Sequence, residues 1–422
     1  MKTRTRVFLV LAMIAALVTT TASVSGAQEV PERNPEPPAT ASEVPDDLPD
    51  VEAPKVGDPV DDAELEDLTT FANQRGISVD RAVADYAWRF DFSLLAAEIR
   101  ERSPEAYTYA EVVGDKSAQI YFSDGMPSEA RVLIDNFERF FPDIPVVVQT
   151  DFGFNETEIN SALTAAHFAV FDVTGDAASH FEHGTKQIRV TVPSTSGQNI
   201  ANLTGRAESA VATMAERSVA GIDVRLSVSS FDSLDEDSLN TLHRGGEALS
   251  TCTSGFTFRH SGNSLTRGST AGHCPNSQSD DGDSLTVNPG DYDGNWGDWQ
   301  LHFGPDPEVD DFYAGTATVV EATNRDTSSA SVPVPNQVLC KNGKVGLKDC
   351  DTVRDTSMCV EANCHLIEMD HSYNIDGDSG GPVFYSRTAY GGVEGTWKKY
   401  FWSTRRDTHS RQDSVHEIWY NY

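Results

Sequence analysis

The six cysteines of this 422-residue chain all lie after residue 251. Their positions are Cys252, Cys274, Cys340, Cys350, Cys359 and Cys364. Disulfides form and persist in exported chains, where they stabilise a fold mainly by restricting its unfolded state. We therefore expect a cross-linked C-terminal domain that must persist outside the cell, preceded by a long segment that folds without such links.

The N-terminus has the features of a secretory signal peptide. Lys2, Arg4 and Arg6 precede an apolar run at residues 7–18, and small residues follow at 25–27. The apolar run is shorter than the roughly 20 residues that a membrane-spanning helix needs. We expect residues 1–27 to be a signal peptide cleaved after Ala27, so that the mature protein is secreted, extracellular and not attached to a membrane.

Composition divides the rest of the precursor and excludes one class of partner. The formal net charge of −33 leaves no basic face for phosphates, so nucleic-acid binding is not expected.

Residues 28–62 are rich in proline and acidic residues and predict a disordered linker. Residues 63–242 show the order strand, helix, strand twice and predict an α+β domain with two βαβ-like repeats. The ranges are 118–122, 128–140 and 144–149, then 187–192, 203–217 and 222–228.

Two short motifs carry the chemistry. Thr-Ala-Gly-His-Cys at residues 270–274 supplies His273, and Gly-Asp-Ser-Gly-Gly-Pro at residues 377–382 supplies Ser379. A serine hydroxyl becomes a strong nucleophile when an imidazole takes its proton, and a carboxylate must orient that imidazole. Glycines allow a tight turn that directs backbone N–H groups to one point. The N–H groups of Gly377 and Ser379 are expected to form an oxyanion hole.

With these motifs, residues 243–422 resemble the chymotrypsin-like serine proteases, within them the bacterial secreted branch of streptogrisins and α-lytic-type enzymes. The order His, Asp, Ser matches that family and differs from α/β-hydrolases and subtilisins. The resemblance implies an all-β mature domain of two six-stranded antiparallel β-barrels with the active site between them. Short β-type runs at 255–259, 299–303, 315–320, 337–339 and 382–385 fit this architecture.

The third catalytic residue must lie between His273 and Ser379. Asp298 best fits the family's pattern of an aspartate followed by an aromatic residue at the start of a strand. Asp291 and Asp293 are alternatives, although turn chemistry explains an aspartate in their glycine-rich loop. Residues 244–248 resemble the family's mature start, so cleavage is expected between Leu242 and His243.

The resemblance also implies disulfide pairs and a support for the catalytic turn. The pairs are Cys252–Cys274 and Cys340–Cys350, which leaves Cys359–Cys364; a zinc site formed by Cys359, Cys364 and His365 is the alternative. The family's third bridge near the nucleophile is missing, so the walls of the specificity pocket are expected to differ.

Lys341 occupies the position of the basic partner of Asp378. A solvated loop lysine is the other interpretation, because the family usually has arginine there.

The specificity pocket should be formed by Tyr373, Asn374 and Asp376 before the nucleophile and by the strand with Glu394 after it. Glu394 or Asp376 would favour a basic substrate side chain by charge pairing, whereas Tyr373 would narrow the pocket for a smaller apolar one. Both possibilities stay open.

The sequence therefore predicts a secreted serine endopeptidase precursor that forms an acyl-enzyme at Ser379, with His273 as base and then acid. Its partners would be protein or peptide substrates and its own propeptide, a folding aid and inhibitor. A monomer is expected, with no cofactor and no metal. The alternatives are a catalytically silent chymotrypsin-fold binding or adhesion protein, an esterase, and a pro-segment that is only a separate binding domain.

Overall fold

The computed structural model describes residues 54–193, 199–214, 221–231, 245–260, 266–280, 283–287, 292–294, 297–303, 311–315, 324–326, 329–371, 374–400, 405–411 and 419–421. The chain divides into two units, Met1–Val44 and Pro45–Tyr422, and every described residue belongs to the second. The expected signal peptide, most of the expected linker and the expected cleavage site between Leu242 and His243 lie outside the described residues. None of the described helices is long and apolar enough to cross a bilayer.

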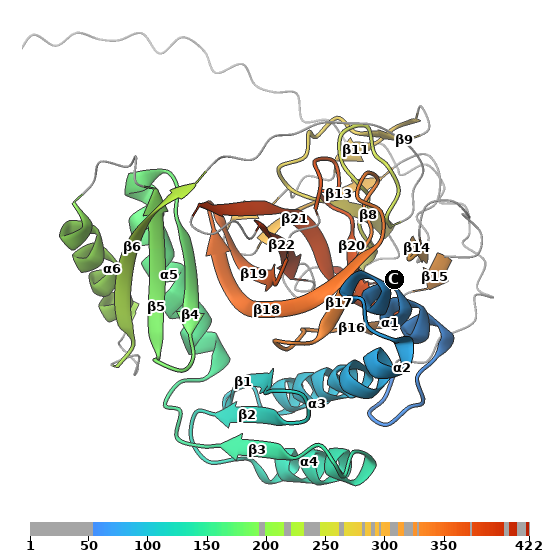
Figure 1. Cartoon of the computed structure of the whole chain (residues 1–422). Coiled ribbons are helices and arrows are strands. Elements are labelled where there is room, and N and C mark those ends of the chain that lie inside the picture. The colour runs from blue at the N-terminus through green and yellow to red at the C-terminus, as the bar shows by residue number, and fades with distance from the viewer. Residues whose placement is uncertain are drawn as a thin grey trace, which may run out of the picture. The chain divides into compact units, whose positions relative to one another are not determined.

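The first part of the second unit is helical and then forms a small mixed sheet (Figure 1). Asp61 caps the first helix by accepting a hydrogen bond from the N–H of Glu64. Strands β1 and β2 are antiparallel, and β2 and β3 are parallel. The elements are α1 (Asp62–Arg75), α2 (Val79–Ala82), η1 (Val83–Ala87), α3 (Trp88–Arg102), β1 (Tyr107–Val112), β2 (Ala118–Phe122), α4 (Ser128–Phe140) and β3 (Val146–Gln149).

A second α/β part follows. Helix α5 begins with a capping box between Asn155 and Glu158. Strands β4 and β5 are antiparallel, whereas β5 and β6 are parallel along seven residue pairs. The predicted order strand, helix, strand is confirmed in both parts. The elements here are α5 (Glu156–Thr174), β4 (Ala178–Glu182), β5 (Gln187–Pro193), α6 (Ile200–Met214) and β6 (Asp223–Phe231).

The first half of the C-terminal region forms a sheet with the strand order β11-β13-β8-β7-β23, and β12 also pairs with β13. Strands β9 and β10 form a separate pair, as do β14 and β15. The strands are β7 (Thr257–His260), β8 (Thr266–Thr270), β9 (Ser279–Asp280), β10 (Asp283–Ser284), β11 (Thr286–Val287), β12 (Tyr292–Gly294), β13 (Gly297–Phe303), β14 (Asp311–Tyr313), β15 (Asn324–Asp326) and β23 (Trp419–Asn421). Most of the strand expected at 315–320 lies outside the described residues.

The second half of the C-terminal region forms a closed ring of strands. The order is β17-β20-β21-β22-β19-β18, and β18 pairs again with β17. Strand β18 also pairs with β4, which joins the ring to the second α/β part, and β16 lies beside β21. The strands are β16 (Ser329–Ala330), β17 (Val338–Lys341), β18 (Asp349–Val360), β19 (Asn363–Met369), β20 (Pro382–Tyr385), β21 (Thr388–Tyr400) and β22 (Arg405–Arg411).

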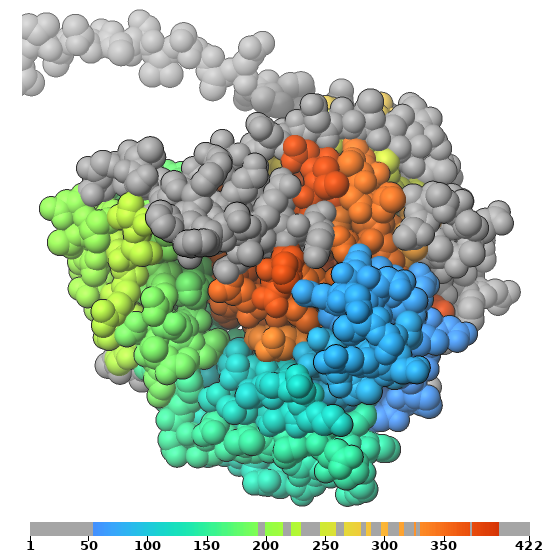
Figure 2. All heavy atoms as spheres, in the orientation of Figure 1, coloured from blue at the N-terminus to red at the C-terminus, as the bar shows by residue number. Residues whose placement is uncertain are grey.

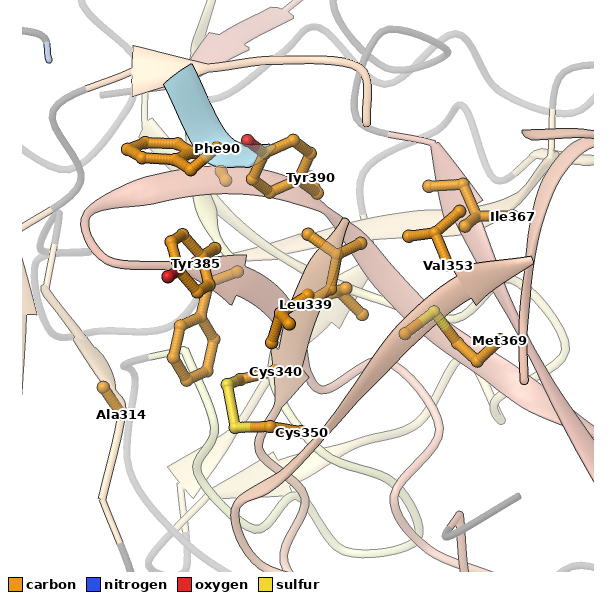
Figure 3. Close-up of a cluster of buried hydrophobic side chains, with 14 of the residues drawn as sticks. Phe90, Ala314, Leu339, Cys340, Cys350, Val353, Ile367, Met369, Tyr385 and Tyr390 are labelled. Atoms are coloured by element: carbon orange, nitrogen blue, oxygen red, sulfur yellow. A yellow bond between two sulfur atoms is a disulfide. The ribbon is translucent and has the colours of Figure 1, made fainter. Parts of the chain in front are cut away.

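The helices at the start of the chain share a hydrophobic core with this ring. Phe71 of α1 and Phe90 of α3 belong to the same buried cluster as Phe384, Tyr385 and Tyr390. The rings of Phe90 and Tyr385 are 5.0 Å apart between centroids, and Figure 3 shows Phe90 beside both tyrosines. In Figure 2 the blue atoms of these helices lie directly against the orange atoms of the C-terminal strands. The N-terminal helices therefore cover apolar surface of the ring.

A buried group of charges ties α1 to the C-terminal region. Asp67 is fully buried, and its carboxylate lies 2.9 Å from Arg325 Nη2 and 2.7 Å from Lys348 Nζ. The backbone N–H of Ser386 donates a third contact, at 2.7 Å. Buried charges are tolerated when each is paired and hydrogen-bonded, and the pairing is strongly direction-dependent. These contacts link α1 to β15, to the residue before β18 and to the turn between β20 and β21.

Candidate active site

His273 and Asp298 form a closely bonded pair in the C-terminal region. His273 lies in the turn after β8, and Asp298 is the second residue of β13, whose Gln300 pairs with Thr270 of β8. The His273 Nδ1 atom is 2.5 Å from Asp298 Oδ2, and the His273 backbone N–H donates to Asp298 Oδ1 at 2.8 Å. Asp298 is 2% exposed. A buried carboxylate with two contacts to one histidine can fix both the orientation and the tautomer of its ring.

Of the two alternative acids, Asp293 lies opposite Asp298 in the β12–β13 register, and Asp291 lies outside the described residues. The aspartate that contacts His273 is Asp298.

A second residue holds the histidine turn and was not anticipated. Gln300 is fully buried, and its amide donates to the carbonyl oxygens of Ala271 and Cys274 at 2.9 and 2.6 Å. These bonds brace the backbone on either side of His273. No specific signal in the sequence indicated this role, because β13 alternates polar and apolar residues and Gln300 takes one of its polar positions.

Ser379 lies in a turn that requires glycine. Gly377 has φ 97° and Gly380 has φ 87°, and a Cβ at Gly380 would collide with Thr270 Oγ1 and the Thr253 carbonyl. Ser379 Oγ donates to the carbonyl oxygen of Glu394 at 3.2 Å. Within the described part of the chain, no acceptor is bonded to the N–H of Gly377 or Ser379. Both donors are therefore available to a ligand at this turn.

Thr253 links the serine turn to the histidine segment, and sequence reasoning missed it. Its N–H donates to the Ser379 carbonyl at 2.8 Å, and its hydroxyl donates to the Gly377 carbonyl at 2.7 Å. Its own carbonyl accepts from Thr270 Oγ1 at 2.7 Å. The two motifs that the sequence singled out are thus connected through one fully buried threonine. Its position next to Cys252 was the only hint.

Asp378 and Lys341 form a buried ion pair beneath the serine turn. Lys341 Nζ is 2.5 Å from Asp378 Oδ2, and the two residues are 4% and 0% exposed. Asp378 also accepts backbone N–H bonds from Ile375, Val345 and Gly346, at 3.1, 3.0 and 2.8 Å. The interpretation of Lys341 as a solvated loop lysine is therefore wrong, because the side chain lies in the interior next to a carboxylate.

Replacement of Lys341 by methionine should destabilise the protein by about 3–5 kcal/mol, because it leaves the Asp378 carboxylate buried without its counter-ion. Urea unfolding followed by circular dichroism measures this. The matched control is the double variant Lys341→Met/Asp378→Asn, which removes both charges and should recover more than half of the loss. A loss below about 1 kcal/mol in the single variant would mean that the pair does not support the turn.

Three disulfides join the six cysteines: Cys252–Cys274 and Cys340–Cys350, which the resemblance implied, and Cys359–Cys364, which was left as the remaining pair. The first connects the segment before β7 to the histidine turn, and the second joins β17 to β18. Because the sulfurs of Cys359 and Cys364 are bonded to each other, they do not offer the two thiolates that the zinc alternative needs.

The residues expected in the specificity pocket have different environments. Tyr373 lies outside the described residues, and Asp376 is exposed. Asn374 is buried, and its amide donates to the Gly395 carbonyl at 3.1 Å, so it holds the turn before Ser379 against β21. Glu394 is buried, and Asn363 Nδ2 donates to its Oε1 at 3.1 Å. The orientation of these side chains toward a substrate stays a prediction.

Comparisons with known proteins give matches to structures alone. No protein-family model matches the sequence, and a search of curated proteins finds no match. Among solved structures, the Nocardiopsis protease is 16% identical, with 43% of this chain and 100% of that chain covered and a TM-score of 0.36. Protease A of Thermobifida fusca is 18% identical, with coverage of 44% and 100% and a TM-score of 0.35.

A third similar structure, a glutamic acid specific serine protease, is 19% identical, with 42% of this chain and 99% of that chain covered and a TM-score of 0.36. These structures are all named as proteases. Identities and TM-scores this low carry no argument about activity, which must come from the residues themselves.

Proposed function

We propose that the chain is the precursor of a secreted serine endopeptidase with the triad Ser379, His273 and Asp298. One observation carries the proposal. A buried aspartate makes two hydrogen bonds to His273, and Thr253 ties that segment to a serine turn whose Gly377 and Ser379 N–H groups have no acceptor among the described residues. A site of this kind provides a base, a nucleophile and donors for developing negative charge.

The proposed reaction begins when Ser379 Oγ leaves the Glu394 carbonyl and attacks the substrate carbonyl carbon, while His273 Nε2 takes its proton. Asp298 stabilises the resulting imidazolium, and the N–H groups of Gly377 and Ser379 donate to the carbonyl oxygen as it becomes negative. The C–N bond then breaks, and His273 gives the proton to the leaving amine. Water releases the acyl group by the same steps, with His273 again as base. No cofactor takes part.

In this proposal, residues 243–422 are the mature domain of two six-stranded barrels with the site between them, and residues 63–242 are a propeptide. The propeptide would aid folding, because a β-barrel rich in non-local contacts folds slowly, and would inhibit until cleavage near His243. The packing of α1–α3 on the closed ring of strands supports close association of the two regions. The substrates would be proteins or peptides outside the cell, and the enzyme a monomer.

A small fluorophosphonate tests the proposal on the full chain. We expect it to phosphonylate one residue at neutral pH, and peptide mapping by mass spectrometry should place the adduct on Ser379. Labelling of urea-unfolded chain should be lost, because the reaction needs His273 beside the hydroxyl. Absence of an adduct both in the folded full chain and after an added protease has trimmed residues 63–242 would favour the alternative, a catalytically silent binding protein of the same fold.

A further inference from the structure

Glu394 is a buried acid beside the proposed triad, and its carboxyl is only half satisfied. The residue lies in β21 and is 6% exposed. Asn363 Nδ2 donates to Oε1 at 3.1 Å, but Oε2 is buried and has no hydrogen-bond partner among the residues that the structure describes. A buried carboxylate oxygen without a donor is costly, whereas a protonated carboxyl reduces that cost.

The surroundings of Glu394 connect it to all three proposed catalytic residues. Its backbone carbonyl accepts the hydrogen bond of Ser379 Oγ at 3.2 Å. The charged groups that act on its side chain are Asp298 of β13, His273 of the turn after β8, and Glu361 of the turn between β18 and β19. The charges of His273 and Asp298 therefore act on the side chain of Glu394, while its backbone carbonyl accepts the hydrogen bond of Ser379.

Burial, and then the charge of Asp298, raise the pKa of the Glu394 carboxyl well above its usual value; His273 and the Asn363 hydrogen bond oppose this rise. The proton is thus bound more tightly in the folded protein than in the unfolded chain. Between the two pKa values the folded state holds a proton that the unfolded state has lost, so stability falls as pH rises toward the folded pKa.

We propose that Glu394 is a positioning residue: its neutral carboxyl adds no second negative charge near Asp298 and His273 and keeps β21 in the place where it holds Ser379 Oγ. This role rests on the proposed function and differs from the pocket wall expected from the sequence. Ionisation would put a second negative charge near Asp298 at a position that is 6% exposed. The strand must then move to hydrate that charge, and the Ser379 acceptor moves with it.

The test is the second-order rate of Ser379 phosphonylation by a small fluorophosphonate, measured on the full chain from about pH 6 to about pH 10. Beyond the ionisation of Glu394 the wild-type rate should fall by about tenfold per pH unit, whereas a Glu394→Gln variant should lose less than about twofold over the same range. Asn363→Ala removes the bond that lowers the Glu394 pKa, so its decline should begin at a higher pH.

Asp355→Asn is the matched control. Burial raises the pKa of Asp355 to about 7, but this acid lies on β18 and acts on Tyr109 of the α/β region. The Asp355→Asn profile should follow the wild type. The inference is wrong if Glu394→Gln declines as the wild type does, or if Asp355→Asn removes the decline equally well. Failure of every variant to react at any pH, before and after trimming of residues 63–242 by an added protease, would instead overturn the proposed function itself.

Discussion

A Ser379→Ala precursor is expected to remain full length, whereas the wild-type precursor converts to a fragment that begins near His243. Removal of the nucleophile from a Ser-His-Asp site lowers kcat by about 10⁶, which is enough to stop a cut that the protease makes in its own chain. Intact-mass spectrometry of both proteins, purified and incubated under the same conditions, measures the conversion directly.

The control for this experiment is Ser209→Ala, which changes an exposed serine on α6 and should convert as the wild type does. Conversion of Ser379→Ala at the wild-type rate would show that another protease makes the cut. A wild-type chain that is never cut, and whose Ser379 is never phosphonylated, would contradict the protease proposal as a whole.

Asp298→Asn should lower the rate of hydrolysis of a peptide substrate by about 10⁴ with little change in the fold. The amide nitrogen of an asparagine would donate to His273 Nδ1, which moves the ring proton to Nε2 and removes the base. The aspartate instead accepts from the histidine and keeps Nε2 free to take the serine proton. Steady-state kinetics on the matured protein give the loss.

Asp293→Asn is the matched control, since Asp293 lies opposite Asp298 across the β12–β13 pair and was an alternative acid from the sequence. It should lose less than about threefold, because the proposed mechanism gives Asp293 no role. If Asp293→Asn lowered the rate of hydrolysis by about 10⁴ and Asp298→Asn did not, Asp293 rather than Asp298 would be the catalytic acid.

The sequence predicted the parts of the fold that depend on local pattern. The run at 187–192 alternates apolar and polar residues, and β5 occupies Gln187–Pro193; the helix at 128–140 matches α4. The ends of the elements were predicted less accurately. The helix expected to begin at residue 203 begins at Ile200, because Asn199 accepts from the N–H of Ala201 and starts the helix earlier. Local periodicity shows that an element exists, but capping contacts decide its first residue.

Residues that act through tertiary contacts could not be assigned in the same way. Thr253 and Gln300 make their hydrogen bonds to carbonyl groups, and any polar side chain of suitable length could do so. Lys341 was ambiguous because its burial depends on the Asp378 loop, 37 positions later. The sequence predicted the strand that contains Glu394 but not the neighbours of this residue. Asn363, which donates a hydrogen bond to Glu394, and Asp298, whose charge acts on it, belong to other strands.

The shared core of α1, α3 and the closed ring of strands affects how a precursor of this kind could become active. Phe71 and Phe90 lie among the ring's own buried residues, and each buried aromatic side chain contributes about 1.5–3 kcal/mol. A single cut near His243 leaves these contacts and the Asp67 ion pairs intact. The two fragments would stay together as one particle after the cut, so cleavage of the precursor and loss of its N-terminal fragment would be separate events.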